Sequence, residues 1–205
     1  SVIKDVKKAL GQKGLIPTDV YFTMGGLYQQ QQIAFRGLIA VFGAAVALVF
    51  FLLLFLFERF RPALAVLFTA LLSVCAVFAG LFISGTELNI SSMMGMTMIL
   101  GIVTEVAIFM AFEFFTAPQE LNRKESLIYA GTQRMRAITM STLAAILALF
   151  PLALGIGQGS AMQRPLAIAI ISGMAFQLPL VFFVLPVLFA VLGVERPKGP
   201  EEATP

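Results

Sequence analysis

The sequence predicts an all-α fold, a polytopic membrane bundle of five transmembrane helices that follows a small extramembrane N-terminal α/β segment. Of its 205 residues, 59% are hydrophobic and only 12% are charged, and the mean hydropathy is +0.94. Soluble domains are about half apolar and a quarter charged, so the surplus apolar surface requires the lipid bilayer as its partner. The apolar runs are long and continuous, which favours helices over the short alternating strands of a transmembrane barrel.

Residues 1–36 are expected to be the end of a larger extramembrane domain. Residues 1–14 have the pattern of an amphipathic helix, and residues 19–24 alternate like a short strand. Residues 27–36 are polar, helix-compatible and continuous with the first apolar run. One helix and one strand cannot bury a core of their own, so this region is interpreted as a fragment of a domain.

Five apolar segments predict five spans, because each is long enough to cross about 30 Å of hydrocarbon. They cover residues 38–57, 63–84, 88–115, 137–156 and 165–192. Pro62 and Pro165 stand at predicted span starts, where the missing N–H costs little. Pro151, Pro179 and Pro186 lie inside or near the ends of spans, where we expect them to kink the helix.

The distribution of Lys and Arg predicts the orientation. Basic residues gather in the first and third predicted connections and in the tail: Arg59, Arg61, Arg123, Lys124, Arg134, Arg136, Arg196 and Lys198. The second connection has none, and the fourth has only Arg164. The first and third connections and a flexible tail of residues 195–205 are therefore expected in the cytoplasm. The lysine-rich N-terminus would then lie outside, and its export predicts an upstream span in a longer protein.

Glu105, well inside the third apolar segment, is the leading candidate for a functional residue. An ionised side chain near mid-bilayer costs roughly 2.5–3.5 kcal/mol on insertion scales, so such residues usually face protein or a water path. At helical periodicity, Thr97, Gly101 and Thr104 share its side of the helix. We expect this small, polar intramembrane face to pack against other helices.

A second polar stripe runs along the fourth apolar segment. Arg134, Ser141 and Thr142 fall on one side, with the basic residue at the cytoplasmic end. Opposite Glu105, these side chains would form a proton relay by holding water between them. The alternative is that Glu105 is a protonated packing residue and Arg134 an anchor of the positive-inside kind. Helix hydroxyls also commonly bond their own backbone.

The sequence predicts neither an enzyme nor a cofactor or metal site. It contains no His, a single Cys and no nucleophile–base pair, and the glycine-rich segment 155–159 lacks the Lys of a P-loop. The basic residues form no cluster with interleaved aromatic residues, so nucleic-acid binding has no support. Glu113 is interpreted as an interfacial residue, and Gln177 as a contact between helices. Glu87 and Asn89 are expected to mark the outer entry and the N-cap region of the third span. An ion gradient is the expected energy source for any transport.

Several segments resemble the efflux permeases of the resistance-nodulation-division (RND) family. Residues 85–95 and 101–105 resemble the third-from-last span of that family, residues 134–144 the start of the penultimate span, and residues 151–160 the loop after it. Residues 26–35 and 57–62 are similar to the approach to the eighth span and the turn into the ninth. The resemblance follows the chain in order over nearly its whole length.

The resemblance implies a place in a larger transporter. Residues 37–194 would be spans eight to twelve of a twelve-span proton antiporter in the bacterial inner membrane. Residues 1–36 would be the end of a periplasmic porter-type domain. An N-terminal permease half or a homo-oligomer (a trimer in this family) is implied as partner, together with a periplasmic adaptor and an outer-membrane channel.

By the same resemblance, Glu105 stands where drug-efflux members have Lys and some heavy-metal members have Glu. Arg134 stands at a basic relay position and Ser141 at a hydroxyl relay position. The family's relay also needs a pair of aspartates from the first half. Two other functions stay open at this point. One is a non-transporting membrane scaffold or relic half-permease, and the other is a proton-driven protein-export subunit of the same superfamily.

Overall fold

The computed structural model describes residues 27–157 and 159–195, and the chain divides into two units, residues 1–34 and 35–205. The helix and strand predicted within residues 1–24 lie outside the described residues, as does nearly all of the predicted tail. In the first unit only the beginning of a helix is described. The fold that bears on function is therefore the helical bundle of the second unit.

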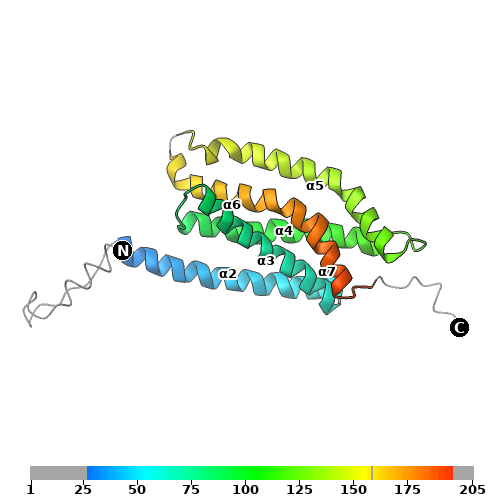
Figure 1. The fold of residues 1–205 in the computed structure, drawn as a ribbon. Coiled ribbons are helices and arrows are strands. Elements are labelled where there is room, and N and C mark those ends of the chain that lie inside the picture. The colour runs from blue at the N-terminus through cyan, green and yellow to red at the C-terminus, as the bar shows by residue number, and fades with distance from the viewer. Residues whose placement is uncertain (1–26, 158, 196–205) are drawn as a thin grey trace, which may run out of the picture. The chain divides into compact units, whose positions relative to one another are not determined.

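The five predicted spans are confirmed as helices that are long and apolar enough to cross a membrane. They are α2 (Leu27–Phe57), α3 (Phe60–Ile83), α4 (Ile90–Thr116), α5 (Arg123–Ala153) and a composite last span (Figure 1). The last span consists of α6 (Ser160–Pro179), the π-helical turn η1 (Leu180–Val184) and α7 (Leu185–Val191). The polar residues before the first apolar run are helical, as expected, because α2 begins at Leu27.

The start of α5 differs from the prediction. The helix begins at Arg123, so Arg134 and Arg136 belong to it and not to the preceding connection. The backbone N–H of Asn122 donates to the Glu125 carboxylate at 2.8 Å, which caps the first turn. Helical hydrogen bonding therefore extends about four turns beyond the apolar segment that the hydropathy pattern identified.

The turn between α5 and α6 is also shorter than predicted. Gly155, Gly157 and Gly159 all have positive φ, a conformation that ends a helix and that glycine adopts at little cost. The Ser160 hydroxyl donates to the Gly155 carbonyl at 2.8 Å across this turn. Since α6 already begins at Ser160, Pro165 lies in its second turn and not at the start of the span.

Two other local predictions are confirmed. Asn89 is the N-cap of α4: its side chain accepts from the Ser92 N–H, and the Ser92 hydroxyl accepts from the Asn89 N–H, both at 2.9 Å. Pro179 is followed directly by η1, because proline has no N–H to continue the α-helical ladder. The chain bends there, and α7 turns away from the line of α6 (Figure 1).

The core of the bundle depends on close approach of α6 to its neighbours α3, α4 and α5. A Cβ built on Gly173 would lie 2.7 Å from the Ile99 side chain of α4, and one on Gly95 would lie 2.8 Å from Ala169 of α6. Gly80 of α3 faces Ser172 in the same way. Small residues let membrane helices pack backbone to backbone, which is how helices associate in lipid.

Three arginines bond the backbone at the C-terminal end of the last span. Arg59 donates from Nη1 to the Glu195 carbonyl at 2.8 Å, and Arg61 donates to the Gly193 carbonyl at 3.3 Å. Arg123 donates from Nη2 to the carbonyls of Phe189 and Ala190. These bonds place positive charge at and just beyond the C-terminal end of α7, which is the negative end of its dipole.

Replacing Gly173 by Leu is expected to lower the free energy of unfolding by about 1–3 kcal/mol, because the new side chain must displace Ile99 in a packed core. Unfolding in a detergent titration, followed by circular dichroism, measures the effect. Gly43→Leu on α2 is the matched control, since a Cβ there meets nothing within 4 Å. Equal stability of the two variants would contradict the close packing of α6.

Candidate functional site

A cleft of about 510 Å³ lies where α4, α5 and α6 meet, and it contains most of the polar residues that the sequence singled out. Its lining comprises Ile102, Glu105, Val106, Phe109, Arg134, Ala137, Ile138, Ser141, Thr142, Ala145, Met174 and Gln177. The structure therefore brings Glu105 of α4 and the polar stripe of α5 to one cavity. It also adds a residue from α6, Gln177, to them.

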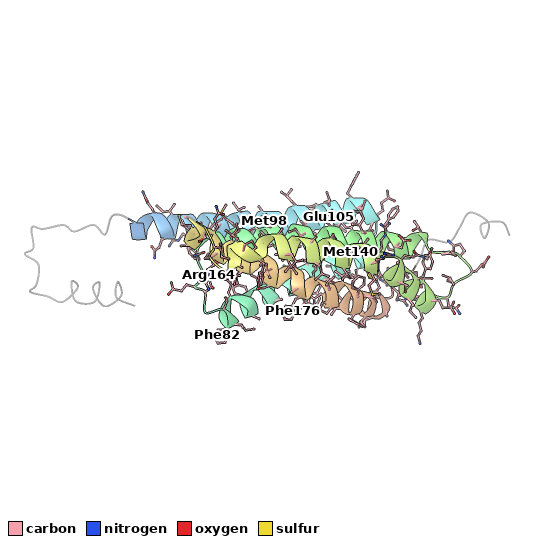
Figure 2. All side chains as sticks on the ribbon, turned by 90° about the horizontal axis from the view of Figure 1, so that it is seen from above. Phe82, Met98, Glu105, Met140, Arg164 and Phe176 are labelled. Carbon is pink, nitrogen blue, oxygen red and sulfur yellow. The ribbon has the colours of Figure 1, made fainter. Side chains whose placement is uncertain are left out.

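Glu105 lies near the midpoint of α4, on the exposed rim of this cleft. In Figure 2 Glu105 lies well away from the end of the bundle at which Phe82 and Arg164 are labelled. Within residues 27–157 and 159–195, its carboxylate has no hydrogen-bond or ion-pair partner. A carboxylate at this depth, open to the cleft, is free to interact with water or with groups supplied from outside the chain.

Arg134 forms an ion pair with a second carboxylate of α4. Its Nε lies 2.8 Å from Oε2 of Glu113, and its guanidinium carbon lies 5.8 Å from the centre of the Phe109 ring. The Glu113 side chain is 19% exposed and that of Arg134 is 40% exposed. The interpretation of Glu113 as a simple interfacial residue therefore missed its role, which is to hold the arginine beside the cleft.

Gln177 forms the buried floor of the cleft. Its Nε2 donates to Thr142 Oγ1 at 2.7 Å, and both residues are 1% exposed. Its Oε1 is buried without a partner among the described residues. A buried amide oxygen without a hydrogen bond costs about 1–3 kcal/mol, so its place beside a polar cleft indicates a donor from within that cleft.

The sequence contained a signal for Gln177 that its interpretation as a packing contact did not use. It is an amide inside an otherwise apolar span, where polar side chains are costly and usually functional. What periodicity could not give is the direction of the side chain, because α6 is buried on several sides by other helices.

The remaining hydroxyls mostly bond their own helices. Ser141 donates to the Ile138 carbonyl at 3.0 Å and is exposed at the cleft, whereas Thr104 donates to the Leu100 carbonyl at 2.6 Å and is buried. Thr97 donates to the Met93 carbonyl at 3.2 Å and is half-buried. The predicted common face of Thr97, Gly101, Thr104 and Glu105 is thus divided between the core and the exposed surface.

On the side of α4 that carries Glu105, the described helices leave part of the surface exposed. Its exposed residues form one stripe: Met94, Met98, Gly101, Glu105, Phe109 and Phe112. A Cβ on Gly101 would meet nothing within 4 Å. The side of α4 that packs instead carries the small and branched residues Gly95, Ile99 and Val103, which fit closely against other helices without burying a charge.

Comparison with known proteins adds independent findings. Residues 1–193 match the model of the AcrB/AcrD/AcrF family. The chain is 32% identical over 186 residues to the swarming motility protein SwrC of Bacillus subtilis (strain 168), covering 90% of this chain and 18% of that protein.

Crystal structures of a heavy metal efflux pump are similar as well. Crystal form II has a TM-score of 0.79 at 28% identity and crystal form I a TM-score of 0.77 at 26% identity; each match covers 94% of this chain and 19% of the pump. The chain thus spans about a fifth of the length of the proteins that it matches.

Replacing Thr142 by Val is expected to lower the free energy of unfolding by about 1–3 kcal/mol, since the buried Gln177 amide would lose its remaining bond. The same detergent titration measures the change. Ser141→Ala serves as the control and should stay within about 0.5 kcal/mol, because that exposed hydroxyl bonds its own helix. If both variants unfold alike, the Gln177–Thr142 bond does not stabilise the junction of α5 and α6.

Proposed function

Because the chain belongs to the AcrB/AcrD/AcrF family of RND permeases, we propose that it is the C-terminal membrane half of a proton-driven efflux transporter. The observation that carries the proposal is the cleft in which the mid-span carboxylate of Glu105 shares a cavity with Arg134, Ser141 and the Gln177–Thr142 pair. Family membership supports transport, and the chemistry of this cleft supports protons as the coupling ion.

Glu105 is the proposed proton carrier. A carboxyl group crosses from charged to neutral by taking one proton, and the charged form is the costly one within hydrocarbon. The cleft is large enough for several waters and is lined by donors and acceptors from three helices, so protons can reach the carboxylate along hydrogen bonds. Ser141, exposed beside it, has a hydroxyl that can both donate and accept.

Arg134 has the proposed role of setting the charge of the cleft. Its bond to Glu113 uses Nε and leaves the other guanidinium donors for the cleft. Because Glu113 is the ion-pair partner of Arg134, Glu105 is left as the unpaired acidic group of the cleft. One α4 carboxylate therefore serves to position the cation, and the other serves to exchange protons.

The exposed stripe of α4 indicates that a further protein segment covers it in the assembled transporter. A carboxylate on an uncovered, otherwise apolar stripe is unfavourable next to acyl chains, so protein or water must face it in the working transporter. We propose that the N-terminal membrane half, with acidic residues of its own, covers this stripe. Assembly as a trimer with a periplasmic adaptor and an outer-membrane channel, and an inner-membrane position with the N-terminus in the periplasm, follow as part of the same proposal.

Replacing Glu105 by Gln is expected to reduce proton-coupled substrate flux by roughly a hundredfold, since the amide keeps the shape of the side chain but cannot take up or release a proton. The measurement uses the complete transporter assembly reconstituted in vesicles, with an imposed pH gradient and simultaneous readout of internal pH and substrate. Antiport should be lost in both readouts together.

The matched control is Glu87→Gln, a carboxylate outside the spans that should leave the flux unchanged. Undiminished coupled flux in the Glu105→Gln transporter would reject the relay role of this residue. If the parent assembly itself moves no substrate against the gradient, the chain is better described as a membrane scaffold.

A further inference from the structure

Two cavities lie at the end of the bundle where α3 begins and α7 ends. The first has a volume of about 350 Å³ and is lined by Arg59 just before α3, by the first residues of α3 including Arg61, and by residues 193–195. The second, of about 320 Å³, is a groove between α3 and α7. Neither cavity shares a residue with the cleft around Glu105.

The first cavity has the chemistry of an anion site. Arg59 and Arg61 each donate one hydrogen bond to a backbone carbonyl of the opposite segment, so both guanidinium groups are held in place. A guanidinium has five N–H donors, and the remaining ones match the oxygens of a phosphate in pairs. The cavity has two cations against the one carboxylate of Glu195, which leaves it positive.

The second cavity is lined only by apolar side chains: Leu64, Leu67, Phe68 and Leu71 of α3, with Leu188 of α7 and Leu192 after it. Its lining continues that of the basic cavity along both segments, since Leu192 precedes Gly193 in the chain and Leu64 follows Arg61 by less than one turn of α3. From Leu64 to Leu71 the groove follows α3 for about 10 Å into the span. That is the shape required by an acyl chain below a phosphate.

We propose that this pair of cavities binds one anionic phospholipid, with its phosphate between Arg59 and Arg61 and an acyl chain along the α3–α7 groove. Positive charge selects the headgroup, and the adjoining groove distinguishes a lipid from a free phosphate. The arginines lie at the end of the spans, in the connection that the basic residues predict to be cytoplasmic, where anionic lipids are available. The bound lipid ties the turn between α2 and α3 to the end of the last span.

The proposal is tested on the detergent-purified assembly that contains this chain, stripped of lipid and titrated with phosphatidylglycerol or phosphatidylcholine of the same acyl composition. Native mass spectrometry counts the bound lipid. We expect tighter binding of phosphatidylglycerol, weakened about fivefold by Arg59→Gln and about fivefold by Arg61→Gln. Leu67→Trp, which fills the groove, should weaken the binding of phosphatidylglycerol without changing the charge.

Lys124→Gln is the matched control: an exposed cation in the first turn of α5 that lines neither cavity. It should leave the lipid affinity unchanged, and Arg59→Lys and Arg61→Lys should bind more tightly than the Gln variants if the fold is intact. The site is overturned if Lys124→Gln weakens binding as much as the arginine variants or if the two lipids bind equally. It is also overturned if millimolar inorganic phosphate displaces the lipid completely, or if Leu67→Trp has no effect.

Discussion

The close approach of α6 to α3 and α4 is the constraint on which the rest of the structure depends. Glycines at 95 and 173 remove the side chains that would otherwise separate the helices, so that Ala169 and Ile99 fill the space. Dispersion contacts of this kind, and not the hydrophobic effect, are what hold helices together inside a bilayer. With α6 packed this closely against its neighbours, the side-chain amide of Gln177 reaches Thr142 of α5 and forms the floor of the cleft.

The same packing sorts the two carboxylates of α4 into different environments. Glu113 is held by Arg134, while Glu105, two turns away, lies on the exposed stripe at the rim of the cleft. One carboxylate of α4 is thus ion-paired, and the other lines the cleft without a partner among the described residues. The ion pair and the open carboxylate support the proposed division of roles, in which Glu113 positions Arg134 and Glu105 exchanges protons.

Three of the arginines on which the predicted orientation rests also bond the backbone at the end of the bundle. Arg59, Arg61 and Arg123 each bond carbonyl groups at the end of the last span, and so link the beginnings of α3 and α5 to its terminus. The positive-inside bias and helix capping therefore reinforce one another. The exposed guanidinium surface that remains is the basis for the proposed lipid headgroup site.

The sequence by itself determined the membrane class, the number of spans, the N-cap at Asn89 and the break at Pro179, because each depends on residues adjacent in the chain. The resemblance of several segments also indicated the family. Helical periodicity predicted that Glu105, Arg134, Ser141 and Thr142 belong to one polar site, and they line one cleft. Only the tertiary structure paired Arg134 with Glu113, turned Gln177 into the cleft and divided the polar face of α4. Periodicity tells which residues share a side of a helix, whereas the neighbour on that side is chosen by how closely the helices can pack.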